Sequence, residues 1–331
     1  MKLRRIRLKG DSSPTIAIFF KDTWLPLRLV LSQAGRVITP EEELLASDMI
    51  AMLRTGPSFR QHLEGLMDAW LMSHEADQEA CDDAPLLPFE PRSYRDFMLY
   101  ERHAVDAARG YAKRFIPAGY LIAAGYERIT GRTFPLFRPK QIWYRKPIYY
   151  MGNHLSFVTE NHGISFPSYS RALDYELELG ALIVTPLRNA TPKEALAAIG
   201  GFVVFNDFSA RDVQLAEMKS GFGPAKAKHF ANAISAVVVS ADEILPFLND
   251  LQGEVRINHE SIVRTSTAGM HFTLGEAIAY ASLEEQLYPG EFVATGTLPG
   301  GSGMENGHWL KPGDTIELSI DKVGTLTNPI L

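Results

Sequence analysis

The sequence predicts a protein of mixed helices and strands in two domains. Apolar, β-branched runs of strand length alternate along the chain with amphipathic segments that begin at recognisable helix caps. The length of 331 residues suits one large domain or two of ordinary size, at roughly 100–200 residues each. A segment rich in proline and acidic residues, 82–91, is typical of a boundary. We therefore expect a small N-terminal domain over 1–85 and a larger one over 86–331.

The composition excludes several classes of protein. Hydrophobic residues make up 46% of the chain and charged residues 22%, which provides ample material for a core. The net charge of −6 argues against a surface for nucleic acid or anionic membrane. No run approaches the ~20 apolar residues of a membrane span, and no apolar region follows the basic start. The single cysteine, Cys81, excludes an internal disulfide. We therefore expect a cytoplasmic protein.

Two strands and two helices are expected in the N-terminal domain. The apolar runs Thr15–Phe20 and Trp24–Leu31 flank a polar tripeptide and predict a hairpin. Thr39 precedes a proline at the first helical position and is followed three residues later by Glu42, an arrangement that predicts a capping box. A second apolar periodicity covers about 59–80, so we expect another helix there.

The segment from Arg95 to about Lys113 predicts the first helix of the larger domain. Asp96 and His103 would lie two turns apart on one face of it, since seven residues rotate by about 700° at 3.6 residues per turn. An aspartate at a helix start is usually a cap, and a lone helical histidine is usually structural or exposed. By itself the pair is therefore a weak signal of a site.

We expect a strand over about 143–151. A second predicted strand, 172–182, follows it and carries several acidic residues. Side chains of a strand alternate between its faces, so apolar residues would lie on one side and Asp174, Glu176 and Glu178 on the other. Glu176 and Glu178 would then repel each other unless a cation, a proton or solvent relieves them. A solvated polar face is the simplest interpretation of this strand alone. Motifs elsewhere in the chain favour a functional site instead.

Polar residues follow the next apolar strand, 201–206. Asp207 stands at its end, and Ser209 is placed to cap a helix. Arg211 and Gln214, three residues apart, would share a face of that helix. Side chains from a strand end and a helix start are thus concentrated within eight residues.

The C-terminal third combines a basic loop with further strands and one helix. The glycine-containing loop 221–228 ends with Lys226 and Lys228, and a solvated turn is the simplest interpretation of it. The glycines of 296–303 match neither a dinucleotide fingerprint nor a phosphate loop. The remaining predicted elements are a strand over 233–239, a hairpin over 253–264 turning near Asn258-His259, a capped helix from Thr273 to about Gln286, and a strand over 315–320.

Four motifs stand in sequence in the larger domain: Asp174-Tyr175-Glu176-Leu177-Glu178, the stretch Asn206–Gln214, Gly223-Pro224 with Lys228, and Thr295-Gly296-Thr297. In this order they resemble the motifs of the fumarylacetoacetate hydrolase family, over about residue 96 to the C-terminus. The resemblance implies an α+β fold, in which a small β-rich N-terminal domain precedes a catalytic domain of mixed β-sheet, a β-sandwich roll. It also implies a homodimer.

The resemblance further implies roles for individual residues. The carboxylates that match metal ligands are those of Asp96, Glu176, Glu178 and Asp207. The other matches are His103 as the catalytic base, Glu305 as the glutamate that orients it, Arg211, Gln214 and Lys228 as contacts of the substrate or its developing charge, and Thr297 as a substrate-binding residue.

Each of these residue types suits the chemistry of a keto acid. Ligands that are all oxygens suit Mg²⁺, Mn²⁺ or Ca²⁺ rather than zinc, and such a cation polarises a chelating diketo or 2-oxo acid. His103 could deprotonate water if a carboxylate fixes its tautomer. Preorganised donors for the oxyanion are worth ~2.7–4 kcal/mol each when well aimed, and Arg211, Gln214 and Lys228 are the candidates.

Three hypotheses of function follow. The leading one is a metal-dependent hydrolase that cleaves the carbon–carbon bond of an acylpyruvate or related β-diketo acid. The second keeps the metal but makes the protein a decarboxylase, hydratase or tautomerase of an oxaloacetate-like 2-oxo acid. The pair Asp96 and His103 favours hydrolysis, which needs a base. The third is a non-catalytic protein with a metal-stabilised fold, and the intact metal, lysine and histidine positions weigh against it.

Overall fold

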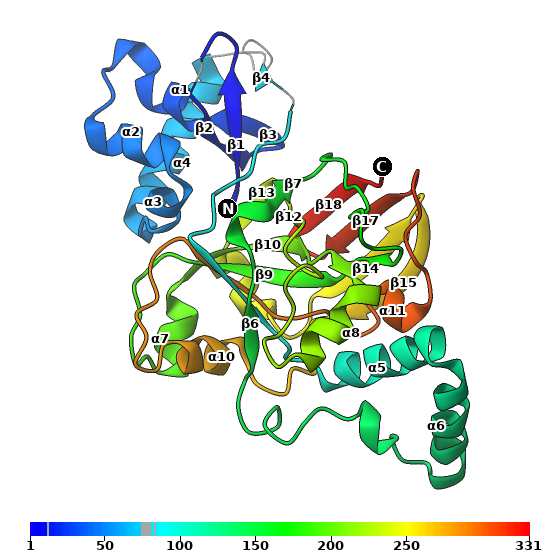
Figure 1. Cartoon of the computed structure of the whole chain (residues 1–331). Coiled ribbons are helices and arrows are strands. Elements are labelled where there is room, and N and C mark those ends of the chain that lie inside the picture. Colours follow the sequence, from blue (N-terminus) through cyan, green and yellow to red (C-terminus); the bar gives the residue numbers. More distant parts are fainter. Residues whose placement is uncertain (12, 74–80, 83) are drawn as a thin grey trace.

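One large sheet forms the centre of the structure (Figure 1). The computed structural model describes residues 1–11, 13–73, 81–82 and 84–331. Within them this sheet has twelve strands, with the main order β3-β2-β1-β13-β10-β9-β16-β5-β6. The strands on this path are β1 (Lys2–Leu8), β2 (Thr15–Phe20), β3 (Thr23–Pro26), β5 (Ser93–Phe97), β6 (Tyr149–Met151), β9 (Leu177–Ile183), β10 (Ile199–Asn206), β13 (Val237–Ser240) and β16 (Glu291–Ala294), and those off it are β4 (Cys81–Asp82), β7 (Phe157–Thr159) and β12 (Asn232–Ile234).

The middle strands of this sheet place the acidic residues. Every residue of β9 and β10 is buried, as expected for strands covered on both faces. The two strands pair antiparallel, with Glu178 opposite Phe205. Strand β16 pairs with β9 on one side and runs parallel to β5 on the other, with Asp96 opposite Ala294. Carboxylates from β5 and β9 and from the end of β10 therefore meet at one end of the sheet.

The N-terminal segment adds four helices beside β1–β3, drawn in blue in Figure 1. The predicted capping box is confirmed, since Thr39 and Glu42 each accept a hydrogen bond from the other's backbone N–H. The predicted helix over 59–80 is present from Pro57 to Ser73, and 74–80 lie outside the described residues. These helices are α1 (Leu27–Ser32), α2 (Pro40–Ser47), α3 (Met49–Leu53) and α4 (Pro57–Ser73).

The predicted strand Trp24–Leu31 is wrong in its second half. Strand β3 ends at Pro26 and the chain continues as α1. Proline has no backbone N–H for a further ladder bond. Leu27, Val30 and Leu31 are buried, and their spacing of three and four residues forms one helical face. The proposed domain division at residue 85 stays a prediction; β1 itself pairs with β13.

The helix predicted from Arg95 is also wrong at its start. Residues 93–97 form β5, which pairs with β16 and β6, and α5 begins only at Glu101. The two ladders satisfy backbone groups that a helix would otherwise satisfy. Asp96 therefore lies on a strand and His103 on a helix, so the argument from a shared helical face does not hold.

Two further expectations need correction. Of the strand predicted over 143–151, only Tyr149–Met151 is a strand. Ser209 caps no helix: it belongs to β11 (Ser209–Ala210), and its hydroxyl donates to the backbone oxygen of Asp207. Strand β11 pairs with β8 (Leu173–Asp174), and this pairing determines where the following helix, α8 (Arg211–Lys219), begins.

A second sheet packs against the first, in the order β15-β14-β17-β18. The predicted hairpin is confirmed, and Asn258 and His259 form its turn with φ of 53° and 68°. The strand predicted over 315–320 is confirmed as β17. The strands of this sheet are β14 (Gln252–Ile257), β15 (Glu260–Ser266), β17 (Thr315–Ile320) and β18 (Gly324–Pro329).

The remaining helices surround the two sheets, and α5 with α6 extends away from them (Figure 1). The helix predicted from Thr273 to about Gln286 has its capping box but ends at Ala281. No helix in the described part of the chain is long and apolar enough to cross a membrane. These helices are α5 (Glu101–Phe115), α6 (Pro117–Thr130), α7 (Pro192–Ala197), α9 (Ala241–Ile244), α10 (Leu274–Ala281) and α11 (Gly303–Asn306).

Candidate metal and catalytic site

Three buried carboxylates converge at one end of the large sheet. Asp96 comes from β5, Glu178 from β9, and Asp207 directly follows β10. One oxygen of each lies within 4.8 Å of those of the other two, and all three residues are buried. We call Asp96, Glu178 and Asp207 the acidic triad. Three segments far apart in the sequence thus place negative charge in one small volume.

The carboxylates of the triad are only partly hydrogen-bonded. Glu178 accepts from the Gly296 backbone N–H at 3.2 Å and from the Thr297 hydroxyl at 3.3 Å. In contrast, Oδ1 of Asp96 and Oδ1 of Asp207 are buried and find no hydrogen-bond partner among the residues the structure describes. Buried oxygens without a donor are rare in folded proteins. Their presence here fits an additional ligand-binding group.

Two tyrosines, the buried Tyr94 and the half-buried Tyr150, connect Asp96 with Asp207. The Tyr94 hydroxyl donates to Asp96 Oδ2 at 3.1 Å, and the Tyr150 hydroxyl donates to Asp207 Oδ2 at 2.6 Å. The two hydroxyls lie 3.1 Å apart. Neither tyrosine was predicted as a site residue. A signal did exist for Tyr94, because residues two apart on a strand share a face.

The electrostatics of the triad favour a bound cation. Burial raises the pKa of Asp96 well above its ordinary range, and the neighbouring charge of Asp207 raises it further. Burial and the charge of Asp96 act in the same way on the pKa of Glu178. Burial also raises the pKa of Asp207, although Lys228 opposes this shift. A divalent cation with oxygen ligands would relieve this repulsion, so the triad fits a metal site.

Glu176 borders the triad but is not part of it. Its Oε1 accepts from Arg211 Nη2 at 2.7 Å, and its Oε2 contacts Lys228 Nζ, which also contacts Asp207. Burial opposes ionisation of Glu176, but Arg211 and Lys228 lower its pKa overall. Gln214 accepts from Arg211 Nη1 at 2.9 Å, as its predicted position on the same helical face implied. Glu176, the fourth predicted metal ligand, is thus in contact with Lys228 and Arg211.

The basic loop separates its two lysines. Lys228 is 3% exposed and lies in the site, whereas Lys226 is exposed. Burial lowers the pKa of Lys228, and the charges of Asp207 and Glu176 outweigh this effect and raise it overall. The interpretation of this loop as a solvated turn therefore holds for Lys226 alone.

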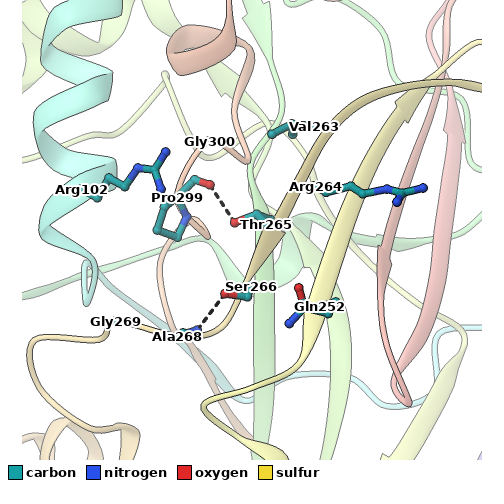
Figure 2. A pocket seen from close by; sticks show the side chains of 10 residues that line it. All are labelled: Arg102, Gln252, Val263, Arg264, Thr265, Ser266, Ala268, Gly269, Pro299 and Gly300. Atoms are coloured by element: carbon teal, nitrogen blue, oxygen red, sulfur yellow. Dashed lines mark hydrogen bonds between the residues drawn. The ribbon is translucent and has the colours of Figure 1, made fainter.

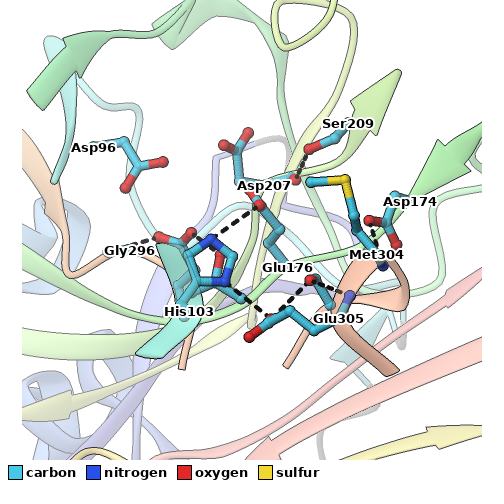
Figure 3. A network of polar contacts seen from close by, with 12 residues as sticks. Asp96, His103, Asp174, Glu176, Asp207, Ser209, Gly296, Met304 and Glu305 are labelled. Carbon is cyan, nitrogen blue, oxygen red and sulfur yellow. Dashed lines mark hydrogen bonds and ion pairs between the residues drawn. The ribbon is translucent and has the colours of Figure 1, made fainter. Parts of the chain in front are cut away.

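His103 lies between Glu305 and Glu176 (Figure 3). Its Nδ1 is 2.9 Å from Glu305 Oε2, and its Nε2 is 3.9 Å from Glu176 Oε1. The imidazole is 5% exposed. Burial lowers its pKa, but the charge and contact of Glu305 raise it overall. Nδ1 and Glu305 lie within ion-pair distance but are not aligned for a hydrogen bond. With Glu305 beside Nδ1, Nε2 is the nitrogen available for proton transfer.

The comparison with protein families identifies the family of this chain. A family model described as the C-terminal part of fumarylacetoacetate (FAA) hydrolase matches residues 130–331, more than half of the chain. The chain belongs to the fumarylacetoacetate hydrolase family. It is therefore an enzyme of this superfamily, and the α+β fold expected from the resemblance is confirmed.

Individual relatives of the family carry different names. The fumarylacetoacetate hydrolase of Exiguobacterium antarcticum has a TM-score of 0.65 at 20% identity, covering 100% of this chain and 99% of that one. Fumarylpyruvate hydrolase from Pseudomonas aeruginosa, solved with Mn²⁺ and pyruvate, has a TM-score of 0.54 at 20% identity, covering 78% and 93%. The 2,4-didehydro-3-deoxy-L-rhamnonate hydrolase of Sphingomonas sp. is 31% identical over 182 residues, 54% of this chain and 63% of that protein. Other structures with this fold are named as isomerases.

Two cavities lie outside the acidic triad of this family member. One of about 580 Å³ lies between α5 and β15, with Arg102 and Thr265 in its wall (Figure 2). The other, of about 300 Å³, shares Arg102 and Gly300 with the first and reaches Glu305. No residue of the triad lines either cavity. The second cavity thus touches the candidate site at Glu305, while the three carboxylates of the triad lie outside both cavities.

Proposed function

We propose that the protein is a metal-dependent hydrolase that cleaves the carbon–carbon bond of an acylpyruvate or a related β-diketo acid. The observation that carries this proposal is the pair His103 and Glu305, because hydrolysis requires a base to activate water whereas metal-assisted decarboxylation does not. The fumarylpyruvate hydrolase solved with Mn²⁺ and pyruvate and the hydrolase named among the relatives support the same class of reaction.

Four carboxylates would hold the cation. Asp96, Glu178 and Asp207 form the triad, and Glu176 lies beside them through their common neighbour Lys228. Mg²⁺ is the ion we propose, with Mn²⁺ or Ca²⁺ as alternatives, because each prefers oxygen ligands. When bound, such an ion polarises the carbonyl of a chelating keto acid.

The base of the proposed reaction is His103. The charge of Glu305 beside Nδ1 would keep a proton on that nitrogen. Nε2 then accepts a proton from water, whose oxygen forms a bond to the acyl carbonyl carbon. The carbon–carbon bond then breaks, and the proton held on Nε2 passes to the carbon of the departing pyruvate unit. The products are a carboxylic acid and pyruvate.

The other polar residues hold the substrate and its developing charge. Lys228 and the Thr297 hydroxyl face the carboxylates of the site and are placed to bind the keto-acid end. Arg211 already donates to Glu176 and to Gln214. Because Gln214 uses its oxygen for Arg211, its amide NH₂ is the group that we assign to the oxyanion.

A substrate screen with one pair of histidine variants tests this proposal. Wild type should release pyruvate from acylpyruvates with Mg²⁺ or Mn²⁺ and lose this activity in chelator. His103→Ala should lower kcat by about 10²–10⁴-fold, the usual contribution of a positioned base, while Mn²⁺ binding is kept. His62→Ala, which changes an exposed histidine on α4, should leave kcat unchanged.

Oxaloacetate serves as the substrate that separates the two enzymatic hypotheses. Decarboxylation needs chiefly an electron sink, which a bound cation supplies, so any decarboxylase activity should survive His103→Ala. Wild-type rates of acylpyruvate hydrolysis in His103→Ala would remove His103 as the base. A wild-type protein that decarboxylates oxaloacetate and hydrolyses no acylpyruvate would contradict the hydrolase and leave decarboxylation as the better account.

A further inference from the structure

A buried carboxylate outside the acidic triad is not used by the proposed reaction. Asp174 ends β8 and is fully buried. Its Oδ1 accepts from the backbone N–H groups of Tyr175 at 2.9 Å and Gly303 at 2.8 Å. Its Oδ2 accepts from the Met304 backbone N–H at 3.0 Å and from Arg211 Nε at 2.8 Å. A carboxylate has about four such acceptor positions, so protein donors saturate this one.

Two of these donors begin the segment that carries Glu305. Gly303 and Met304 are the first residues of α11, and Glu305 follows them. Figure 3 shows Asp174 beside Met304, with Glu305 between this contact and His103. The Gly300 backbone N–H and the Ser302 hydroxyl also donate to the Glu305 carboxylate, each at 2.8 Å. The distance of 2.9 Å between Glu305 and His103 therefore depends on these two donors and on where the start of α11 is held.

Glycine at position 303 permits this close approach. A Cβ atom there would lie 2.5 Å from Asp174 Oδ1 and 2.5 Å from the backbone oxygen of His308. Such distances are well below van der Waals contact, so any side chain would push α11 away from the carboxylate. The far end of α11 is held separately, by the hydrogen bonds between Asn306 and the Tyr175 hydroxyl.

The remaining donor connects Asp174 with the opposite side of the site. Arg211 uses Nε for Asp174 and Nη2 for Glu176, at 2.8 Å and 2.7 Å. A guanidinium held by two carboxylates through different nitrogens has a defined plane. One carboxylate thus holds both the segment of Glu305 and the arginine that holds Glu176.

We propose that Asp174 is a positioning residue for the proposed hydrolysis: it fixes Glu305, and through it His103, while holding Arg211 against Glu176. It touches no reacting atom and is not a ligand of the triad. This inference rests on the proposed function, because the reaction is what requires His103 to be aligned.

Asp174→Asn tests the inference with little change of shape. An asparagine has one acceptor oxygen and one NH₂ group. Two of the four groups that donate to Asp174 would therefore face this NH₂ group and lose their acceptor. We expect kcat to fall by about 10–100-fold, the usual effect of removing a partner that orients a site residue, with KM unchanged because substrate contacts are kept. In Glu305→Gln, adding Asp174→Asn should lower kcat by less than it does in wild type, since both changes remove the alignment of His103 and only the hold on Arg211 remains to be lost.

Asp212→Asn is the matched control. Asp212 also lies on the segment of Arg211, but its carboxylate accepts from Ser170 and from the Arg171 backbone N–H and touches no residue of the site. The same substitution there should leave kcat unchanged. If Asp174→Asn does not fold, Gly303→Ala tests the same contact. The added methyl group would push the start of α11 away from Asp174 and should lower kcat with KM unchanged.

Hydrogen exchange of the peptide that contains 300–307 gives a readout without substrate. The Gly303 and Met304 amides should exchange faster in Asp174→Asn than in wild type or Asp212→Asn. Unchanged exchange, or an additive loss of kcat in the double variant with Glu305→Gln, would overturn the role of Asp174. If wild type hydrolyses no diketo acid, the proposed function fails, and the exchange result alone then decides whether Asp174 holds α11.

Discussion

At the scale of single residues, the surroundings of His103 connect structure with reaction. Its two nearest carboxylates lie on opposite sides of the ring, Glu305 at Nδ1 and Glu176 near Nε2. Burial alone would favour the neutral imidazole, and Glu305 reverses this preference. The base is thus protonated up to a higher pH than an ordinary histidine, and the carboxylate that orients it also sets its proton affinity.

Glu305→Gln should move the acidic limb of the pH profile of kcat/KM to lower pH. Activity rises as pH passes the pKa of His103, because only neutral imidazole accepts a proton. Removing the charge of Glu305 lowers that pKa, so the limb shifts downward, while the plateau falls by about 10–100-fold through lost orientation. The profile of kcat/KM reports the free enzyme. An unmoved limb would show that Glu305 does not act on His103; Glu260→Gln, an exposed change on β15, is the control.

Lys228 and Lys226 form a natural pair of variants two residues apart. Lys228→Ala removes a cation that contacts Glu176 and Asp207 and should lower kcat/KM by at least about 10²-fold, as for a lost charge-stabilising group. Lys226 is exposed, so Lys226→Ala should remain within about twofold of wild type. Steady-state kinetics of both variants measures this. The opposite ranking would mean that the loop 221–228 is placed differently in the working enzyme.

At the scale of elements, the site depends on close packing of the strands that carry the triad. Gly180 of β9 faces Phe292 of β16, and a Cβ atom at this position would lie 2.3 Å from that ring. The glycine therefore lets β9 approach β16, which in turn pairs with β5. This approach brings Glu178 and Asp96 within reach of one cation.

Gly180→Ala should destabilise the fold by about 1–3 kcal/mol through overpacking and lower metal affinity by displacing Glu178. Gly65→Ala is the contrasting variant, because Gly65 lies in the middle of α4 with open space around its Cβ position. It should stabilise the protein by about 0.4–1 kcal/mol, since alanine has less unfolded-state entropy. Denaturant unfolding with and without Mg²⁺ measures both. Equal stability of the two variants would contradict the packing argument.

At the scale of the whole molecule, the metal-free protein stores unfavourable electrostatic free energy in the triad. The folded-state pKa values of Asp96 and Glu178 are raised by burial and mutual repulsion. Such groups favour folding when protonated, so their contribution is present below the ordinary pKa of about 4 and is lost as pH rises toward the raised values. A bound cation requires the ionised carboxylates and therefore stabilises the fold most at higher pH.

Mg²⁺ should raise the melting temperature more at about pH 7.5 than at about pH 5.5, because burial and repulsion raise the pKa values of Asp96 and Glu178 and a cation binds their ionised forms. At a concentration of 100 Kd the ion stabilises by about 2.7 kcal/mol. Asp207→Asn should lose most of this shift, whereas Asp212→Asn, away from the triad, should keep it. Differential scanning fluorimetry with Mg²⁺ or chelator measures the shifts. Equal shifts in wild type and Asp207→Asn would remove the triad as the metal site.

The homodimer expected from the family resemblance is also a property of the whole molecule and stays a prediction. Light scattering coupled to size exclusion would report twice the mass of the chain if it holds.

The sequence by itself determined the features that depend on neighbouring residues. The capping boxes at Thr39 and Thr273 and the hairpin turn at Asn258 are as predicted, because their partners lie within a few positions. The order of the four motifs was sufficient to indicate the family, and the resemblance then named ten residues, three of which (Asp96, His103 and Glu305) lie outside those motifs. The structure brings these residues close together. The positions of motifs along the chain identify candidate site residues even when the distances between those residues in the fold are unknown.

Only the tertiary structure decided how those residues are arranged. Asp96 belongs to a strand because β5 hydrogen-bonds to β16, about two hundred positions later, and no local pattern contains such a partner. Glu176 lies outside β9 and faces Arg211 and Lys228, although strand alternation alone would place it with Glu178. The proposed role of Asp174 depends on Gly303, which lies 129 positions later in the sequence. Long-range pairing and burial decide which carboxylates share a cation and which hold a helix, and these are properties of the folded chain.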